Sequence, residues 1–506
     1  CSFLLSQGKC VADALYYYGD DTPNFIFIKE EVTDLGQGYD WDKCSLDVLL
    51  NRVRIKDGKI ILPDGMTYRI LVLPEEKALN IKLLRKLEKL VHDGLILIGP
   101  KPEKSTGLTE YPEVDAAVSE IAEKLWGNID GNGIKVNKFG KGKVIWGLTP
   151  GETLRSVNIN PDFSYSSAAD STCLEYIHRS IGKEEIYFVV NRLARHGIYD
   201  TQYRYLTDLP DRYEEVVCKF RVTGKIPELW NPMTGEIKQP AVYHDDGYYT
   251  YVPLHLNPEG SVFVIFVANS NDKHIIKIVK DGEEIFPAAV RPGSKFPTIE
   301  CYYTEEGVIT TFSQPGNYTL RWSDGTENTT NVKEPLSVIP IDSSINLKFL
   351  NQWGPKETIA ISEFKSWSDF EDKRIKYYSG PAEYLTVFNL KNGSLAGKKV
   401  LIDLGNVQEI AAVWINDEYA GVAWIAPFIL DITGFVHEGN NKLTVRVVNS
   451  WVNRLIGDGH LPPEKRYTRT NVLKFEGGDK DHLLRKSGLT DDIKLIIIDE
   501  KIIGHF

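Results

Sequence analysis

Residues 80–100 read NIKLLRKLEKLVHDGLILIGP, and this stretch decides the class of the first domain. In residues 80–93 the apolar side chains recur at helical spacing, which predicts an amphipathic helix with one buried stripe. The stripe consists of Ile81, Leu84, Leu87 and Val91. Gly94 is a typical helix end, and residues 95–98 form an apolar run of strand length. A helix that passes directly into a buried strand indicates an α/β domain.

The same alternation continues on both sides of this stretch. Further helices are predicted at residues 44–52 and 114–125, and strands at 11–18, 59–62, 69–73 and 143–146. Strands that alternate with helices imply a mostly parallel sheet covered by helices. Residues 10–157 are therefore predicted to form an α/β domain, which resembles the flavodoxin and class I amidotransferase folds. Glutamine chemistry needs a cysteine nucleophile at a tight strand-to-helix turn, but residues 99–102 read Gly-Pro-Lys-Pro, so this chemistry is not expected.

After residue 157 the pattern changes to short strands without helical stripes. The predicted domains are a β-sandwich at 158–270, a small β-rich linking domain at 271–350 and a jelly-roll β-sandwich at 351–506. The clearest strands are predicted at residues 186–191, 216–222, 248–253, 262–268, 399–404, 410–416 and 443–449. Residues 410–415 are apolar on both alternating faces, which predicts a strand buried between two layers. The predicted fold class is multidomain, α/β plus all-β.

Composition and charge argue against several classes of protein. The 506 residues carry a formal net charge of −11 with scattered Lys and Arg, which disfavours a nucleic-acid partner. No apolar run reaches the roughly 18 residues that a transmembrane helix needs. The six cysteines form no C-x-x-C pair, and in a chain of this length they are predicted to be buried thiols.

The first residues suggest an unusual beginning. No initiator Met or signal peptide is visible, and Phe3-Leu4-Leu5 leads into Gly8 as the last turn of a helix would. Residues 1–9 are therefore predicted to be the end of a preceding domain that is missing here. The alternative is a mature lipoprotein acylated at Cys1, although such a cysteine is usually followed by a polar tether.

The usual catalytic motifs are not present in the sequence. It contains no G-x-S-x-G nucleophile elbow, no H-E-x-x-H helix, no P-loop and no D-x-D-x-D-G calcium loop. Adjacent acidic residues at 20–21, 245–246 and 491–492 fit solvated turns. With 70 acidic residues, the chain has room for the carboxylate pair of a glycosidase. It shows no barrel-like series of βα units that would hold such a pair.

Segments along almost the whole chain carry a family resemblance. They lie at residues 1–8, 11–19, 49–52, 62–69, 98–102, 229–235 and 448–458. These segments are similar to glycoside hydrolase family 106, the α-L-rhamnosidases, and the run Val-Asn-Ser-Trp-Val-Asn-Arg-Leu-Ile-Gly-Asp at 448–458 is the most family-specific. A second set resembles the jelly-roll sugar-binding domain of β-galactosidase-type enzymes. It comprises residues 413–417, Gly421, Pro427, 430–433 and 439–443.

The resemblance implies a bacterial enzyme, secreted or periplasmic, that removes L-rhamnose from plant polysaccharides such as pectin with inversion. In that family the two catalytic glutamates and a calcium ion lie in a barrel that precedes the region resembled here. No catalytic residue, metal ligand or cofactor is therefore expected in this chain. The implied partners are rhamnose-containing plant glycans and the missing N-terminal barrel.

Six residues near the end of the chain are candidate contacts for carbohydrate or for the barrel. They are Trp424, Trp451, Asn453, Arg454, Asp458 and His460. Tryptophan rings cover the apolar face of a sugar, and an arginine binds a carboxylate or a pair of hydroxyls. The alternative for each residue is structural: the tryptophans pack within the sandwich, Arg454 and Asp458 anchor a loop, and His460 is an exposed loop residue.

The sequence leaves three functions open. The first is the accessory C-terminal half of a rhamnosidase-like hydrolase, inactive without its barrel. The second is a free-standing carbohydrate-binding or scaffold protein built from the same domains. The third is an independent glycosidase whose carboxylate pair lies within this chain.

Overall fold

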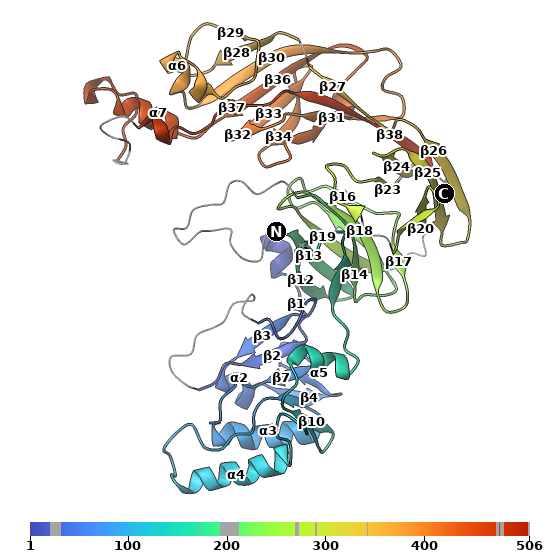
Figure 1. Cartoon of the computed structure of the whole chain (residues 1–506), viewed down its shortest axis with the longest axis vertical. Coiled ribbons are helices and arrows are strands. Elements are labelled where there is room, and N and C mark those ends of the chain that lie inside the picture. The colour runs from blue at the N-terminus through green and yellow to red at the C-terminus, as the bar shows by residue number, and fades with distance from the viewer. Residues whose placement is uncertain are drawn as a thin grey trace. The chain divides into compact units, whose positions relative to one another are not determined.

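The computed structural model describes residues 1–20, 32–170, 172–192, 212–268, 273–288, 291–341, 343–471, 475 and 480–503. The chain divides into two compact units. The first comprises Cys1–Ile278, Glu284–Gly293 and Arg321–Thr326, and the second comprises Val279–Glu283, Ser294–Leu320 and Glu327–Phe506. Strands far outnumber helices in the described residues, and most strand pairs are antiparallel (Figure 1). The predicted class, α/β followed by all-β domains, is confirmed at this level.

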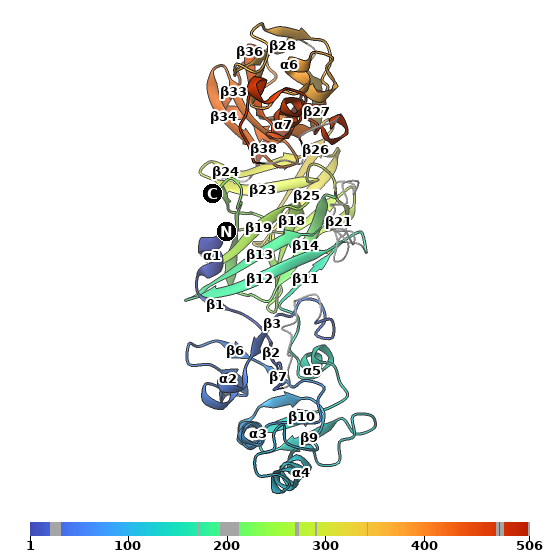
Figure 2. The ribbon, with the colours of Figure 1, turned by 90° about the vertical axis from the view of Figure 1, so that its left-hand side faces the viewer.

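The N-terminal part of the first unit contains a six-stranded sheet. Its order is β3 (Trp41–Cys44), β2 (Ala14–Tyr17), β7 (Ile70–Val72), β8 (Ile96–Ile98), β10 (Gly142–Ile145) and β9 (Val136–Phe139). All neighbours are parallel except β10 and β9. Four helices accompany the sheet: α2 (Leu46–Asn51), α3 (Ile81–Asp93), α4 (Glu113–Trp126) and α5 (Pro150–Ser156). Figure 2 shows α2 and α3 on one side of the sheet and α5 on the other.

The helix predicted from residues 80–93 is α3, and it begins and ends at the expected capping residues. The side chain of Asn80 accepts a hydrogen bond from the backbone N–H of Lys82, and Gly94 ends the helix with φ of 128°. The buried stripe packs in one core with the apolar residues of α4 and the sheet. A separate core on the opposite face includes Leu154 of α5. A small antiparallel sheet follows α2, with β4 (Arg54–Lys56), β5 (Lys59–Ile61) and β6 (Thr67–Tyr68).

A β-sandwich completes the first unit. One sheet has the order β1 (Lys9–Cys10), β12 (Leu174–Ile181), β13 (Glu184–Asn191), β19 (Ser261–Ala268), β15 (Lys225–Trp230) and β16 (Ile237–Lys238). The other contains β11 (Phe163–Ser166), β14 (Glu214–Phe220), β18 (Thr250–Leu256) and β17 (His244–Asp245), with β22 (Arg291–Pro292) beside β14. Apolar residues from both sheets share one core.

The first ten residues lie on this β-sandwich. Helix α1 (Ser2–Ser6) packs Leu4 and Leu5 against Ile186, Phe263 and Ile265, and β1 pairs with β12. Four of the six cysteines are buried as predicted, whereas Cys1 is exposed and Cys10 is half-buried. The prediction of buried thiols is wrong for these two because they belong to a surface segment rather than to a core strand.

Three strands are divided between the two units: β20 (Ile275–Lys280), β21 (Glu283–Phe286) and β25 (Gly316–Trp322). Strand β26 (Glu327–Val332) belongs to the second unit.

The second unit is a β-sandwich of two antiparallel sheets. One sheet contains β23 (Ile299–Thr304), β24 (Gly307–Phe312), β38 (Lys494–Ile503), β31 (Lys398–Asp403) and β35 (Ile429–Asp431), with β27 (Leu336–Pro340) beside β38. The other contains β29 (Ile359–Ile361), β28 (Ile345–Phe349), β30 (Pro381–Leu390), β36 (Gly439–Val448), β33 (Ile410–Ile415) and β34 (Glu418–Ala423). Shorter elements are β32 (Val407–Gln408), β37 (Gly488–Leu489), α6 (Lys373–Lys376), α7 (Val452–Gly459), η2 (Trp367–Asp369), η3 (Thr433–Phe435), η4 (Pro463–Lys465) and η6 (Asp481–Leu483).

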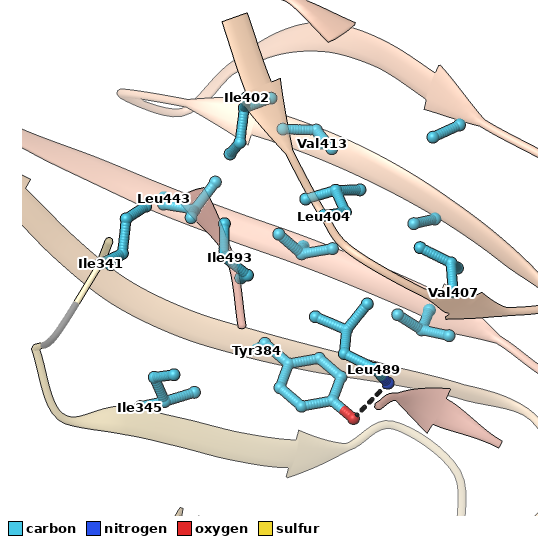
Figure 3. Close-up of a cluster of buried hydrophobic side chains, with 14 of the residues drawn as sticks. Ile341, Ile345, Tyr384, Ile402, Leu404, Val407, Val413, Leu443, Leu489 and Ile493 are labelled. Atoms are coloured by element: carbon cyan, nitrogen blue, oxygen red, sulfur yellow. Dashed lines mark hydrogen bonds between the residues drawn. The ribbon is translucent and has the colours of Figure 1, made fainter. Parts of the chain in front are cut away.

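Side chains from both sheets interlock in the core of this sandwich (Figure 3). Ile402 comes from one sheet and Val413 and Leu443 from the other, and all three are fully buried. The hydroxyl of Tyr384 accepts hydrogen bonds from the backbone N–H of Leu489 at 2.9 Å and from the indole N–H of Trp367 at 2.8 Å. The buried polar atoms are thus paired, as a low-dielectric core requires.

Strand β33 corrects one prediction. Its inner face, formed by Ala411, Val413 and Ile415, is fully buried, but Ile410 on the other face is 44% exposed. Trp414 on that outer face is half-buried beneath the guanidinium of Arg446, at 4.7 Å from its ring centroid. Burial on both faces is therefore wrong, because only one face of this sheet packs on the second sheet. Lateral packing among outer side chains explains why that face is also apolar in sequence.

Candidate functional site

Five of the six candidate residues lie on or next to helix α7, which sits at one end of the second unit's β-sandwich, next to α6 (Figure 1). The helix follows β36 after a short turn, and Trp451 is its N-cap residue. Its inward face carries three buried polar residues, Asn453, Arg454 and Asp458. Buried polar side chains need hydrogen-bond partners, so the contacts of these three residues show what the region does.

Arg454 and Asp458 form an ion pair one helical turn apart. The Nε atom of Arg454 lies 3.1 Å from Oδ1 of Asp458, and both side chains are 5% exposed. The guanidinium also lies over the ring of Tyr467, at 4.8 Å from its centroid. Burial lowers the pKa of Arg454, and the negative charge of Asp458 partly offsets this effect.

The carboxylate of Asp458 also organises the chain after the helix. Its Oδ2 atom accepts hydrogen bonds from the backbone N–H of Thr468 at 2.8 Å and from the hydroxyl of Thr468 at 2.6 Å. Its Oδ1 atom accepts a third from the backbone N–H of Tyr467 at 3.2 Å. One carboxylate therefore holds the pair 467–468 against α7, with both oxygens engaged.

Asn453 joins the helix to a third segment. Its side-chain amide donates to the backbone carbonyl of Arg485 at 2.8 Å, and its Oδ1 atom accepts from the backbone N–H of Arg485 at 2.8 Å. The same amide nitrogen lies 3.3 Å from the hydroxyl oxygen of Ser487. The amide of Asn453 thus both donates to and accepts from the backbone of Arg485, as a paired β-strand would, and it fixes the position of residues 485–487. Asn453 has a structural role in this protein.

His460 belongs to a polar cluster centred on Asp481. Its Nε2 atom lies 2.9 Å from Oδ1 of Asp481, and Lys376 lies 2.8 Å from the other oxygen. The hydroxyl of Tyr377 donates to the same carboxylate at 2.9 Å. Burial alone raises the pKa of Asp481, but hydrogen bonds from Lys376, His460 and Tyr377 outweigh it and lower the pKa to about 2. His460 is thus partnered by an acid 21 residues away, which the sequence pattern did not indicate.

The two candidate tryptophans are both on the surface. Trp451 is 57% exposed, and its ring packs against that of Trp353 at 5.2 Å between centroids with a 59° angle. Trp424 follows β34 and is 51% exposed. Trp353 was missed by sequence reasoning because it lies in a separate loop almost a hundred residues earlier. Together Trp451 and Trp353 form an aromatic step beside the start of α7.

A cavity of about 220 Å³ opens at the other end of α7. Its wall is formed by Leu455, Asp458, Gly459, Pro463, Arg466, Thr468, Arg469, Thr470 and Phe475. The usual glycosidase mechanism needs two carboxyl groups that flank the scissile bond. Among the described residues of this wall Asp458 supplies the one carboxylate, and that carboxylate is held by Arg454 and by the backbone at 467–468. The described part of the wall therefore offers no pair of free carboxylates.

Within the described ranges no three His, Cys, Asp or Glu side chains gather closely enough to hold a metal ion. In the same ranges no helix combines the length and apolar character needed to cross a membrane.

Comparison with known proteins relates the chain to carbohydrate-active enzymes. Residues 1–244 match the family model of glycoside hydrolase family 106, described as alpha-L-rhamnosidase. A putative beta-glucuronidase of Formosa agariphila is 27% identical over 99% of this chain, which spans 56% of that protein. A beta-galactosidase of Clostridium acetobutylicum is 34% identical over 102 residues, which make up 18% of this chain and 11% of that enzyme.

A solved structure extends the relationship to the fold. The rhamnosidase from Novosphingobium sp. PP1Y matches with a TM-score of 0.70 and 26% sequence identity. The match covers 98% of this chain and 40% of that chain. The present chain therefore spans about half the length of its curated relative and less than half of the solved rhamnosidase.

Proposed function

Because the resemblance to glycoside hydrolase family 106, the α-L-rhamnosidases, holds over residues 1–244, we propose that this chain is the accessory, non-catalytic portion of such a hydrolase. The whole enzyme would release L-rhamnose from plant polysaccharides. The catalytic carboxylates and a calcium ion would lie in a barrel outside this chain. Secretion to the periplasm or the medium is part of the same proposal.

One observation carries the proposal. The rhamnosidase of Novosphingobium sp. PP1Y contains the equivalent of 98% of this chain, yet that equivalent is only 40% of its length. A relative of this kind has ample sequence besides the shared part in which to hold the reaction centre. The α7 cavity agrees with this division, since Asp458, the one carboxylate among its described lining residues, holds the backbone and side chain of Thr468.

The finer domain assignments are part of the proposal too. Taken in chain order, the parallel strands of the first sheet run second, first, third, fourth and fifth across the sheet. Doubly wound flavodoxin-like domains share this order, which supports a flavodoxin- or amidotransferase-like scaffold. The two-layer core of the second unit's sandwich supports a jelly-roll architecture, and a sugar-binding role for it is proposed from the resemblance to β-galactosidase-type enzymes.

A second candidate function is carbohydrate binding without catalysis. The exposed step of Trp451 and Trp353 favours it, because aromatic rings at loop ends can stack on a sugar ring. Under this alternative the chain would bind glycans as a free-standing protein.

The deciding experiment is a hydrolysis assay of the purified chain on p-nitrophenyl α-L-rhamnoside and pectic oligosaccharides. The full-length Novosphingobium rhamnosidase serves as positive control, and a mock preparation corrects for host enzymes. We expect turnover by the control and none by this chain. Turnover that follows the purified chain through successive columns would overturn the accessory role and support the independent glycosidase.

A further inference from the structure

One sheet of the second unit carries an exposed apolar row across one end of its outer face. The row crosses β34, β33, β36, β30 and β28, which lie side by side in this order (Figure 1). Its members are side chains that face away from the core of the sandwich: Trp424, Ile410, Val448, Pro381 and Leu350. Four of them are between 38% and 51% exposed, and Pro381 is half-buried. Contiguous exposed apolar surface of this kind marks an interaction site.

The register of the strands brings these side chains together. Val448 pairs with Ile410 on one side and with Pro381 on the other. Leu350 continues the row, because its backbone N–H donates to the carbonyl of Pro381 at 3.1 Å. Trp424 directly follows β34, whose last residue pairs with the neighbour of Ile410 in β33, so alternation places both side chains on the outer face. Four steps of about 4.8 Å between strands make the row about 19 Å long.

The aromatic step described above extends this row at the end opposite Trp424. Trp353 lies in the loop just after Leu350, and Trp451 lies in the turn just after Val448. The two rings meet at 5.2 Å between centroids, and Trp451 is 57% exposed. The row therefore has exposed tryptophan rings near both of its ends.

A polar row runs beside the apolar one, two residues further along each strand. Arg446 pairs in register with Ala412 and with Glu383, and Glu383 pairs with Lys348. The guanidinium of Arg446 donates to Glu383 from Nε at 3.1 Å and from Nη2 at 2.7 Å, and it covers the ring of Trp414. The side chain of Arg446 is nevertheless 42% exposed, and Lys348 is exposed. Hydrogen-bond donors thus lie along one side of the apolar row.

The width of the row favours a glycan over a protein partner. A stable protein interface takes about 800 Å², or roughly 20–30 residues, from each partner. The apolar row is only one side chain wide before the charged residues begin. A sugar chain is narrow, presents apolar C–H faces to aromatic rings, and carries hydroxyl groups that both donate and accept hydrogen bonds. The row is also long enough for several sugar rings in line.

We propose that this row binds an extended polysaccharide chain laid across the end of the sheet. Sugar rings stack on Trp424 and Trp451, and hydroxyl groups of the chain bind Arg446 and Lys348. This inference rests on the proposed function in that the whole enzyme acts on polysaccharides, which the match to glycoside hydrolase family 106 supports. It adds that this part of the enzyme holds several sugar residues of the substrate at once.

The dependence of affinity on chain length tests the proposal. Calorimetric titration of the full chain uses free L-rhamnose and size-fractionated pectic oligosaccharides of two, four and six sugar residues. We expect the hexasaccharide to bind at least about tenfold more tightly than the disaccharide, because only the longer chain reaches both ends of the row. Equal affinities across the series would overturn the proposal, and so would the absence of binding by every member.

A pair of variants on one edge of the sheet locates the site. Trp424→Ala removes an exposed ring from the row, and we expect about tenfold weaker binding of the hexasaccharide with an unchanged thermal midpoint. Tyr419→Ala is the matched control, because Tyr419 belongs to β34 and is 53% exposed but lies beside Trp414, outside the row. It should bind as the parent does. Unchanged affinity in Trp424→Ala would overturn the proposal.

Light scattering tests the protein alternative on the same samples. We expect the parent and Trp424→Ala to have the mass of one chain at the concentrations of the titration. A parent that dimerises and a Trp424→Ala variant that does not would make the row an interface between copies of this chain, and the glycan proposal would be wrong.

The failure of this proposal can be told apart from the failure of the accessory role. Hydrolysis is scored in the assay described above. Binding that depends on Trp424, together with turnover by the chain, would defeat the accessory role and keep the polysaccharide site. An inactive chain that binds no oligosaccharide would keep the accessory role and defeat the site.

Discussion

Two regions of this protein bury arginine–aspartate pairs, and they differ in what surrounds the pair. In the first unit Arg221 lies between two aspartates, with Nη2 at 3.0 Å from Asp13 and at 3.3 Å from Asp162. In the second unit Arg454 pairs with Asp458 at 3.1 Å, and the same carboxylate borders an open cavity. The aspartates of the first region are enclosed by the fold, although the side chain of Arg221 is 24% exposed. In the second region both partners are almost fully buried, and the carboxylate of Asp458 nevertheless lines a cavity.

The enclosed network continues through a buried histidine. His178 lies 2.8 Å from Asp162 through Nδ1 and 3.2 Å from Glu185 through Nε2, and Lys225 lies 3.0 Å from Glu185. The series joins Asp13, just before β2 of the α/β domain, to residues of the β-sandwich. Because every charge meets a protein partner, this network is suited to hold two domains together. The comparison teaches that buried ion pairs of the same type serve different segments: one joins two domains, and the other holds the chain that follows α7.

The largest expected effect comes from breaking the enclosed network. Arg221→Met leaves Asp13 and Asp162 buried without their shared cation, and removal of one partner of a buried pair costs about 3–5 kcal/mol. Urea unfolding followed by tryptophan fluorescence measures the loss. Arg54→Met, at an exposed arginine of the same unit, is the control and should change little. A loss below about 1 kcal/mol in Arg221→Met would mean that the network does not stabilise the domain junction.

The next effect is expected at the open pair. Asp458→Asn removes the charge that partners buried Arg454 and weakens the bonds to residues 467–468, at a cost of about 2–3 kcal/mol. We expect faster proteolysis of the loop after α7 and a lower thermal midpoint. Glu464→Gln changes an exposed acid in the same loop and serves as the control. If both variants resist the protease equally, Asp458 does not anchor this loop.

The enclosed network also predicts a pH dependence on the acidic side. Burial raises the pKa of Glu185, but hydrogen bonds from His178, Lys225 and Ser180 lower it to about 2, below the ordinary value of 4.5. Its stabilising contribution is therefore complete above about pH 4.5 and is lost as the pH falls toward 2, at up to about 1.4 kcal/mol per pH unit. Glu185→Gln should flatten the stability profile in this window. Parallel profiles for the parent and the variant would refute the assignment.

Above neutral pH the same network predicts the opposite change, a loss of stability as the pH rises. Burial alone lowers the pKa of His178, but the charges and hydrogen bonds of Asp162 and Glu185 raise it by more than burial lowers it. The folded-state pKa therefore lies above the ordinary value of 6.5. This contribution is complete below pH 6.5 and is lost as the pH rises through the folded-state pKa. NMR titration of the ring protons checks the direction, with His92→Gln, at an exposed histidine, as a spectral control. A folded-state pKa below 6.5 would contradict the network.

The smallest effect on stability is expected at the aromatic step. Trp451→Ala removes a ring that is 57% exposed, so the free energy of unfolding should fall by only about 0.5–1 kcal/mol. Glycan binding should fall far more if Trp451 and Trp353 form a stacking surface. Titration with pectic oligosaccharides measures this, and Tyr248→Ala, an exposed aromatic residue of the first unit, is the control. Equal binding by both variants would remove the step from the candidate site.

Local periodicity was enough to predict the longest helices and the most apolar strands. Helix α3, its end at Gly94 and strand β8 follow from the spacing of apolar residues within 21 positions of sequence. Such signals act between near neighbours, so tertiary packing does not need to be known. The face that β33 exposes was not predictable in this way, because an apolar side chain can be covered by a second sheet or by its lateral neighbours.

The sequence by itself determined the multidomain class of α/β plus all-β, the family resemblance and the polar residues at 453, 454 and 458, which it placed in a loop and not on helix α7. Only the tertiary structure decided their roles. It paired Arg221 with Asp13 across 208 positions, His460 with Asp481, and Asn453 with the backbone of Arg485. It also placed Arg466 and Arg469 in one cavity wall. The physical reason is that the role of a charged side chain depends on its partners and its solvent exposure. Both are set by chain segments that lie far apart in sequence.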